Sequence, residues 1–482
     1  MHASLPDGLT LFHSLLNVYF AVLVVYFFVG NGGYMLLMLL SVVSVWLHKR
    51  SRSYEGLQLL RQSPATPPVT IIMPACNEQK AIVNSVWAAL KTDYPGLEVC
   101  VVDDGSEDET LERLSAAFSL APVTLITRPR LATRRVRALF VSSDFPNLLV
   151  ISKDHGGKPD ALNAGLNVCR TPYFCTLDSD CILDRDALLR LMWPVVHSTA
   201  PVAASGGIVR VLNGCDRADG QVVKVEAPPG NLERFQVVEY LRSFLFGRTA
   251  WNLLGGTLIV SGAFALLHRA TVLEVGGFLN DTVTEDMELV VRLRRWAAEQ
   301  GRTLRTNFTS NPVCWVECPR ERRMLARQRR RWQLGLCQTL WKYRSMVLNP
   351  AFGTLGLISL PFHVLVEACG AVVEPLGYAI IPLLVWVDPS RLRFLIPVLA
   401  FGMAWAGVLS IAAVVLEEMT YRHYRSPRSL AILLLYALIE NIGYRQIVLL
   451  WRFQGVVRFL TGNHDWEKVV HDGLEEQEAN RP

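Results

Sequence analysis

Two pairs of aspartates follow apolar, strand-like segments in the middle of the chain. Asp103 and Asp104 end LEVCVVDD, and Asp178 and Asp180 end YFCTLDSD. In open parallel sheets, ligands bind beyond the carboxyl ends of the strands. Mg²⁺ and Mn²⁺ prefer oxygen ligands, and one or two carboxylates suffice when substrate phosphates supply the rest. An acidic strand end is more often only a turn or a helix cap, but two such ends on one sheet favour a site for a nucleotide and a metal ion.

A third acidic motif, Thr284-Glu285-Asp286, precedes a segment with helical spacing of its apolar residues. If Thr284 caps this helix, the two carboxylates lie in the first turn, where the helix dipole favours negative charge. Taken alone, capping is the simpler interpretation. The chemical alternative is that Asp286 faces a cleft and accepts a proton from an attacking hydroxyl. Upstream, SGAF (261–264) has the small residues that a close-packed turn beside a ligand would need.

A basic motif, QRRRW (328–332), stands shortly before a long apolar run. Arginine forks and the tryptophan indole N–H are suitable donors for the charge that gathers on a departing diphosphate. On a helix Gln328, Arg331 and Trp332 share a face, whereas Arg329 and Arg330 would point elsewhere, toward lipid phosphates. The alternative is an interfacial helix that binds anionic lipid. That alternative explains the charge but not the glutamine and tryptophan on the face of Arg331.

The elements that must position these motifs alternate between strand and helix. Parallel strands covered by helices on both faces are the expected result, which is the α/β class. The predicted strands are 69–75, 97–105, 123–127, 147–154 and 173–180, and the predicted helices are 79–91, 108–118 and 158–169. A basic loop is expected over 128–137 and an exposed excursion over 213–231.

Hydrophobic segments on either side of this domain predict membrane helices. The chain of 482 residues is 51% hydrophobic, and residues 14–46 carry no charge, which exceeds the ~20 apolar residues that cross a bilayer. Basic residues after the first and third runs place the middle domain in the cytoplasm. We expect 351–387 to cross once, with a re-entrant portion near Glu367 and Glu374. Whether 430–451 crosses stays open, because Glu440, Asn441 and Arg445 interrupt it. The apolar runs are 14–46, 351–387, 394–416 and 430–451.

Composition excludes some other classes of protein. The ten cysteines are scattered, without zinc-site spacing or a regular disulfide framework, so reduced thiols are expected. The net charge is +5, and the basic clusters are short and lack interleaved aromatic residues. No nucleic-acid partner is therefore expected, and the clusters suit a membrane surface or an anionic ligand better.

Taken in order, these motifs resemble those of the family 2 glycosyltransferases. The likeness is greatest to membrane-embedded, processive synthases of β-polysaccharides, the group that makes cellulose, chitin, hyaluronan and poly-N-acetylglucosamine. It covers roughly residues 66–345 and rests on PACNE (74–78), VVDDGS (101–106), GGKPDALNAG (156–165), LDSD (177–180), SGAF (261–264), TED (284–286) and QRRRW (328–332). The resemblance implies the nucleotide-diphospho-sugar transferase fold, called GT-A, for this domain.

The resemblance also implies a role for each motif. Matching positions in the family bind the donor nucleotide (Glu78, Asp103, Asp104 and Lys158), hold Mg²⁺ or Mn²⁺ on its diphosphate (Asp178 and Asp180), act as general base (Asp286), and border the acceptor and diphosphate (Gln328, Arg331 and Trp332). The implied reaction is an inverting transfer from a UDP-sugar to a polysaccharide or lipid-linked acceptor. Trailing helices would lead the growing chain out of the cytoplasm.

The expected organisation is that of a multi-pass protein of a bacterial inner membrane, in contact with its lipids. Its parts are an N-terminal anchor (1–50), a cytoplasmic GT-A domain (51–320), an interfacial helix with Q-x-x-R-W (321–350), transmembrane or interfacial helices (351–455) and a polar tail (456–482). Few trailing apolar runs are visible, which leaves room for a partner membrane or export protein. No phenylalanine gating loop and no PilZ-like box is recognisable.

Two other functions remain open at this point. A non-processive enzyme would add one sugar to a membrane lipid, and related enzymes share these motifs. A catalytically inactive receptor or scaffold is the second alternative, although the intact Asp180, Asp286 and Arg331 count against it.

Overall fold

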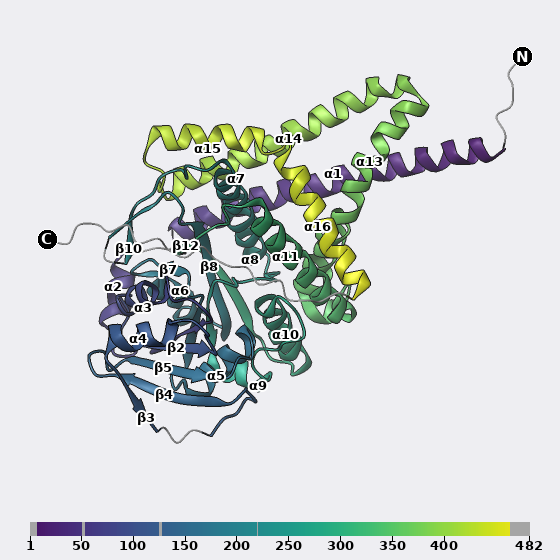
Figure 1. The fold of residues 1–482 in the computed structure, drawn as a ribbon. Helices are drawn as coiled ribbons and strands as arrows, with labels where there is room; N and C mark the ends of the chain where they lie inside the picture. Colours follow the sequence, from purple (N-terminus) through teal and green to yellow (C-terminus); the bar gives the residue numbers. More distant parts are fainter. Residues whose placement is uncertain (1–6, 51–53, 125–127, 219, 463–482) are drawn as a thin grey trace, which may run out of the picture.

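A ten-stranded mixed sheet lies at the centre of the fold (Figure 1). The computed structural model describes residues 7–50, 54–124, 128–218 and 220–462. In spatial order the strands are β3 (Leu120–Val123), β4 (Val136–Ser142), β5 (Leu148–Lys153), β2 (Leu97–Asp104), β1 (Val69–Ala75), β6 (Tyr173–Leu177), β11 (Phe264–His268), β8 (Val202–Val211), β12 (Arg305–Val316) and β7 (Cys181–Leu183).

Strand direction brings the acidic motifs to one edge of this sheet. β1 pairs in parallel with β2 and β6, and β2 pairs in parallel with β5. β8 and β12 are also parallel, whereas β4, β11 and β7 run antiparallel to their neighbours. In this register Ala75 lies opposite Asp103, and Phe264 at the start of β11 lies opposite Leu177 at the end of β6. The carboxyl ends of β1, β2 and β6 and the start of β11 therefore share an edge.

Alternate residues of the inner strands serve two separate cores, which is why helices cover both faces. Side chains alternate between the faces of a strand. In β1, Ile71 and Met73 belong to the core formed with α3 and α4, whereas Ile72 belongs to the core formed with α5 and α10. Full burial on both sides explains the continuous apolar sequence of VTIIMPA.

Helices and short turns surround the sheet and lead from it toward the membrane segments. They are α2 (Tyr54–Gln62), α3 (Ile82–Leu90), α4 (Thr110–Phe118), α5 (Lys158–Val168), α6 (Ala187–Val196), α7 (Asn231–Tyr240), the π-helix η1 (Leu241–Arg248), α8 (Thr249–Leu253), α9 (Arg269–Glu274), α10 (Glu285–Glu299), α11 (Arg322–Lys342), η2 (Arg344–Met346) and η3 (Pro350–Phe352). A small antiparallel ribbon, β9 (Asp216–Ala218) with β10 (Gln221–Lys224), lies within the excursion expected over 213–231.

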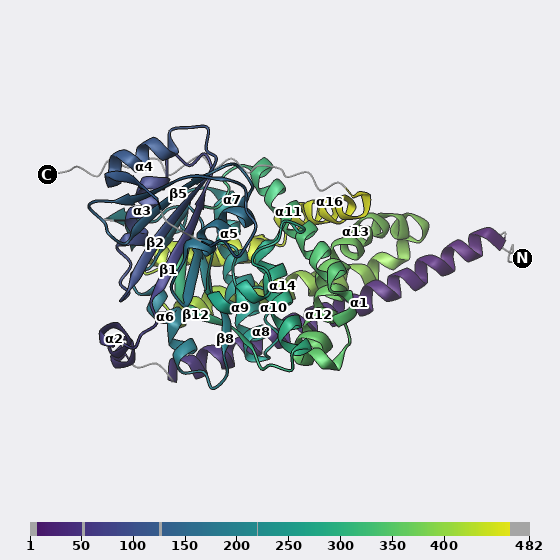
Figure 2. The ribbon, with the colours of Figure 1, turned by 90° about the horizontal axis from the view of Figure 1, so that it is seen from below.

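The remaining helices project to one side of the sheet (Figures 1 and 2). They are α1 (Asp7–Arg50), η4 (Leu355–Ser359), α12 (Leu360–Phe362), η5 (His363–Ala368), α13 (Gly370–Val387), η6 (Pro389–Arg391), α14 (Leu392–Thr420), α15 (Pro427–Ile439) and α16 (Tyr444–Thr461). By length and composition three segments of the described chain could cross a membrane: Asn17–Leu47, Leu355–Val387 and Pro389–Thr420. α1 passes from α13 and α14 to η1 and α8, so the first segment also contacts the sheet-bearing part.

The interrupted apolar run near residue 440 is two helices. α15 and α16 meet at an angle of 61°, as in a broken span or a re-entrant loop. Glu440 lies at the break, where its carboxylate accepts hydrogen bonds from Arg242 of η1 and Ser410 of α14. The carboxylate that interrupts this apolar run is therefore buried among protein donors rather than exposed to lipid.

The α/β class with a largely parallel sheet is confirmed, with two local corrections. β1, β2, β5 and β6 and helices α3, α4 and α5 lie within two or three residues of their predicted bounds. The strand expected over 123–127 is wrong in the part that the structure describes, because β3 ends at Val123. Residues 125–127 lie outside the described chain. The loop expected over 128–137 is wrong at its end, because β4, which was not predicted, begins at Val136. Its residues Val136–Ser142 are half exposed, so the apolar pattern is weak.

Candidate active site

A group of carboxylates lies at the carboxyl edge of the sheet, just beyond β1 and β6. Asp178, Asp180 and Cys181 each place one ligand atom within 4.8 Å of the others. Glu78, a few residues beyond β1, is close enough for their charges to act on it. Burial, then the charges of Asp180 and Asp178, raise the pKa of Glu78 to about 8. The crowding of these acids is relieved by a proton or a cation.

Lys158 provides positive charge beside this group. It is the first residue of α5, and its Nζ lies 2.6 Å from Asp178 Oδ1 and 3.2 Å from Glu285 Oε1. Burial alone would lower the pKa of the amine, but the charges of Asp178 and Glu285 raise it, so Lys158 stays protonated. Nζ also donates to the Gly262 carbonyl at 3.0 Å. One lysine thus ties β6, α10 and the segment before β11 together.

Asp286 lies in the first turn of α10, inside the same site. Burial, then the charge of Glu285, raise the pKa of its carboxyl. A Cβ on Gly262 would lie 3.2 Å from Asp286 Oδ2, so a side chain at position 262 would crowd the carboxylate. Thr284 occupies the N-cap position, but its hydroxyl makes no capping hydrogen bond. Capping by Thr284 therefore does not explain the motif.

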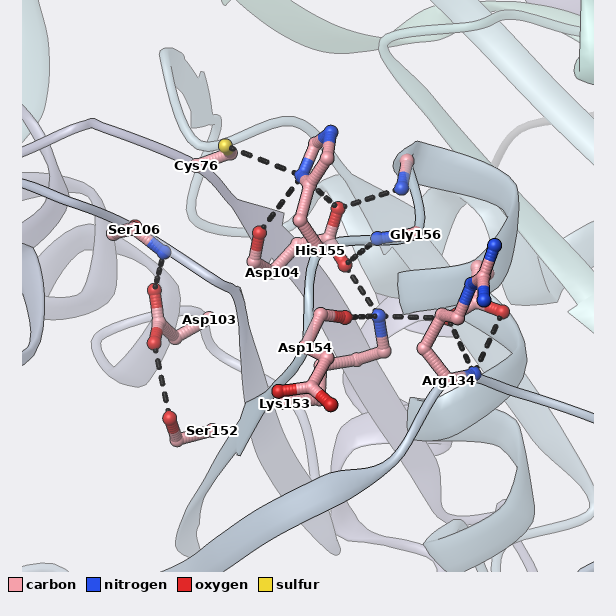
Figure 3. A network of polar contacts seen from close by, with 12 residues as sticks. Cys76, Asp103, Asp104, Ser106, Arg134, Ser152, Lys153, Asp154, His155 and Gly156 are labelled. Carbon is pink, nitrogen blue, oxygen red and sulfur yellow. Dashed lines mark hydrogen bonds and ion pairs between the residues drawn. The ribbon is translucent and has the colours of Figure 1, made fainter.

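The two aspartates that end β2 differ in their surroundings (Figure 3). The Asp104 carboxylate accepts hydrogen bonds from the amides of Gly156 and Gly157, at 3.0 and 2.8 Å, and from Lys153. Asp103 points the other way and accepts from the Ser106 amide and the Ser152 hydroxyl, each at 3.2 Å. Both side chains are nearly fully buried, and their partners here are protein groups.

The QRRRW motif lies on α11, with Gln328, Arg331 and Trp332 facing the site as the helical spacing predicted. The expectation that Arg329 points toward lipid phosphates is wrong. Its side chain is 2% exposed, and its guanidinium pairs with Glu239 at 2.8 Å and lies 4.3 Å from the centre of the Trp332 ring. Because the partner lies on α7, remote in sequence, helical spacing alone could not place this arginine.

A single cavity of about 1600 Å³ joins these groups. Those sequence-predicted site residues that line it are Glu78, Asp104, Lys158, Asp178, Asp180, Asp286, Gln328, Arg331 and Trp332. Asp103 is the exception, because it is buried beneath Ser106 and Ser152. The volume lies above the few hundred Å³ of an ordinary small-ligand pocket, so a ligand with several rings fits.

The cavity continues among the helices that are apolar enough to cross a membrane. We call this part the membrane arm and define it by five residues that line the cavity on α1, α12, η5, the break after α15, and α16, namely Tyr34, Phe362, Glu367, Glu440 and Arg452. Polar groups at this depth are expensive unless they face a cavity or one another. The site at the sheet edge is therefore open toward the membrane side of the molecule.

The acidic group fits a hard divalent cation. Its donors are the carboxylate oxygens of Asp178 and Asp180, and Mg²⁺ and Mn²⁺ prefer oxygen. The raised pKa values of Glu78 and Asp178, the latter about 6 and caused first by burial, are the mark of carboxylates that lack enough positive charge. A bound cation would supply that charge.

Two residues of the site were not identified as site residues from the sequence. Glu285 was assigned only to the helix dipole, yet it pairs with Lys158. Arg248 ends the π-helix η1 and lines the cavity; it donates to the Val260 carbonyl at 3.0 Å and lies 3.9 Å from the centre of the Phe244 ring. Burial lowers the pKa of Arg248 to about 10, against the opposing charge of Asp286. A π-helix leaves no readable spacing, so this arginine could not be singled out.

Comparison with known proteins gives one family and several distant relatives. The model of the family described as "Glycosyltransferase like family 2" matches residues 67–335. Poly-beta-1,6-N-acetyl-D-glucosamine synthase of Staphylococcus aureus is 23% identical over 297 residues, which cover 62% of this chain and 60% of the relative. The synthase of the same name from Staphylococcus epidermidis is 21% identical over 267 residues, 55% of this chain and 54% of the relative. The chain thus spans less than two thirds of the curated relatives it matches.

Among solved structures, a mannosyltransferase from Pyrobaculum calidifontis in complex with GDP-Man and Mn²⁺ aligns with 90% of this chain and 99% of its own. It is 19% identical, with a TM-score of 0.48. The match of the family model covers more than half of the chain.

Proposed function

The chain belongs to glycosyltransferase family 2, and we propose that it transfers a sugar from a UDP-sugar to a growing polysaccharide at a membrane. The observation that carries this proposal is the shared cavity. It contains the acids of the sheet edge, the donors of α11 and the membrane arm. The relatives named as poly-beta-1,6-N-acetyl-D-glucosamine synthases support a polysaccharide product.

In the proposed reaction Asp286 is the general base. Its carboxylate accepts the proton of the acceptor hydroxyl, and the oxygen attacks the anomeric carbon of the donor sugar. The bond from that carbon to the diphosphate breaks, and UDP leaves with the electron pair. Because attack comes from the face opposite the leaving group, the configuration inverts. Asp286, at the start of α10, lies beside Gly262, where a side chain would crowd the carboxylate that is to meet the acceptor hydroxyl.

Positive groups on two sides of the cavity suit the departing diphosphate. Lys158 approaches from α5 and Arg331 from α11. Fixed cationic donors of this kind stabilise developing negative charge without reorganising during the reaction. A divalent ion held by Asp178 and Asp180 would neutralise further charge on the diphosphate.

The membrane arm supports export of the product and a multi-pass topology. Elongation at the sheet edge would deliver the chain into a passage with polar walls. In this proposal the sheet lies in the cytoplasm, where sugar nucleotides are made, and a partner membrane protein completes the passage. Among the described membrane helices, α1 and α14 leave many apolar side chains exposed, which lipid or such a partner would cover.

The same arm favours a second candidate function. A lipid-linked acceptor could enter it from the bilayer and receive one sugar, in which case the enzyme would not be processive. Product length distinguishes the two, because a polymer requires repeated transfer to the same chain.

The experiment that tests the proposal uses the purified full-length protein in lipid nanodiscs. Radiolabelled UDP-sugars, with GDP-mannose as a further donor, are supplied with Mn²⁺, and the products are sized. We expect a polymer from one UDP-sugar and none from Asp286→Asn. A product carrying one sugar supports the lipid-acceptor alternative, and the absence of both product and nucleotide release with every donor would indicate an inactive scaffold.

A further inference from the structure

Lys153 is a charged residue in the interior of the sheet domain that the proposed reaction does not use. It ends β5, and its side chain is 0% exposed. A buried ammonium is costly unless it is paired and hydrogen-bonded. The groups that contact the ammonium therefore indicate which parts of the fold Lys153 holds together.

The Lys153 ammonium lies between two carboxylates from different elements, of which Figure 3 labels Asp104. It donates to Asp104 at the end of β2 and lies 2.7 Å from Asp160 Oδ1 in the first turn of α5. A third contact, 2.6 Å long, goes to the Asp154 carbonyl. Without the ammonium, the two carboxylates would repel each other and separate the end of β2 from the start of α5.

The same carboxylates hold the loop that begins α5. Asp104 accepts from the amides of Gly156 and Gly157, and His155 Nδ1 lies 3.0 Å from its Oδ2. Asp160 accepts from the Arg134 amide at 3.1 and 3.2 Å. Gly157 has φ of 87°, a conformation that favours glycine.

The residue after this loop is Lys158, whose Nζ reaches Asp178, Glu285 and the Gly262 carbonyl. The buried ammonium therefore holds Asp104 and Asp160, and Asp104 in turn holds the backbone of Gly156 and Gly157. That backbone continues directly into Lys158, whose amine lies at the acids proposed to bind the metal ion. A displacement of the loop would move that amine by a similar distance.

We propose that Lys153 is a positioning residue, which clamps β2 to α5 and thereby sets the place of the Lys158 amine beside Asp178. This inference rests on the proposed function, in which Lys158 stabilises the departing diphosphate. Asp104 then acts mainly by ordering the glycine loop and only secondarily by touching the nucleotide.

The test combines kinetics with amide exchange on the full-length protein in nanodiscs. Lys153→Met keeps the length of the side chain and removes its charge. We expect kcat/KM for the donor to fall about a hundredfold, the effect of misplacing a catalytic group by about 1 Å. Amides of residues 154–160 should exchange faster, with the rest of the sheet unchanged. In the Lys153→Met/Lys158→Met double variant the loss should equal that of Lys158→Met alone, within about threefold.

A matched control is Arg190→Met, which breaks a partly buried ion pair with Asp186, 2.5 Å long, elsewhere in the same domain. Its effect should be small and should multiply with that of Lys158→Met. If Lys153→Met fails to fold, Asp160→Asn removes one arm of the clamp while Lys153 and Asp104 remain, and faster exchange over 154–160 is again expected.

Unchanged exchange at 154–160, or losses from Lys153→Met and Lys158→Met that multiply, would overturn the proposal. The exchange result does not depend on turnover. An inactive wild type with a loop that loosens in Lys153→Met would therefore refute the proposed function and leave the clamp intact.

Discussion

The two ends of the cavity solve the problem of buried charge in different ways. At the sheet edge the charges of two cations, Lys158 and Arg248, act among five acids, namely Glu78, Asp178, Asp180, Glu285 and Asp286. Toward the membrane, carboxylates are matched with arginines: Glu239 with Arg329, Glu367 with Arg452, and Glu440 with Arg242.

This difference indicates at which end of the cavity the buried charges are balanced without a ligand. On the membrane side each of these carboxylates is neutralised by its arginine, so the pairs leave the cavity wall polar but nearly neutral. Such a wall suits the passage of an uncharged, hydroxyl-rich chain. The sheet edge carries excess negative charge, which a divalent cation would offset. The chemistry is therefore expected at the sheet edge, and the membrane side is expected to respond to mutation through stability.

The largest expected effect is on the rate, at the sheet edge. Asp286→Asn removes the proton acceptor and should lower kcat by about a thousandfold, within the range of general base catalysis. Steady-state transfer of radiolabelled sugar measures it. Glu299→Gln, the same change at the exposed end of α10, serves as the control and should leave the rate unchanged. Comparable rates for both variants would refute the role of Asp286.

The next effect is on stability, at the other end of the cavity. Arg329→Met leaves Glu239 without its guanidinium and should lower the free energy of unfolding by about 3 kcal/mol, because breaking a buried pair strands a charge. The Arg329→Met/Glu239→Gln double variant should recover most of the loss. Thermal unfolding in detergent reports both. Arg331→Met, two residues along α11, should slow sugar transfer without lowering the free energy of unfolding. If Arg331→Met destabilised the protein as much as Arg329→Met, the proposed difference between the two ends of the cavity would be refuted.

Metal binding should stabilise the sheet edge in a way that depends on its acids. Mn²⁺ at a hundred times its dissociation constant adds about 2.7 kcal/mol to the free energy of unfolding. The thermal midpoint of the wild type should rise with Mn²⁺ and return with a chelator, and that of Asp178→Asn/Asp180→Asn should not move. An equal rise in the double variant would place the ion elsewhere.

The last expected effect is a pH dependence caused by Glu78. Its pKa is about 8 in the folded protein and about 4.5 when unfolded, so the folded state holds an extra proton between these values. The stability contributed by that proton is complete below pH 4.5 and is lost as the pH rises through about 8. The midpoint of the metal-free protein should therefore fall from pH 5 to pH 8, and Glu78→Gln should flatten the fall. A wild-type midpoint that rises over this range would contradict the assignment.

The sequence was most informative where local pattern determines structure. Continuous apolar runs such as VTIIMPA predicted strands buried on both faces, and the acids that follow them necessarily meet at one edge once the strands are parallel. Helical spacing also placed Gln328, Arg331 and Trp332 on one face of α11.

Long-range packing was beyond such patterns. The partners of Arg329 and Glu440 are remote in sequence, on α7 and η1, and no spacing rule connects them. The half-exposed β4 lacks an apolar pattern, and Lys153 looked like an ordinary strand end until its two carboxylates were seen beside it. The roles of Asp103 and Asp104 as nucleotide contacts stay predictions, and their present partners are protein groups.

The central claim is that sugar transfer at the sheet edge feeds a chain into the membrane arm. The most direct test replaces Phe362, which lines the arm on α12, with the photocrosslinker p-benzoylphenylalanine and illuminates the protein during synthesis. Phe459 of α16, beside Trp341, is the control position. The account predicts radiolabelled glycan attached at position 362, dependent on donor and absent in the Asp286→Asn background. Polymer made at the normal rate but never captured at 362 would contradict it.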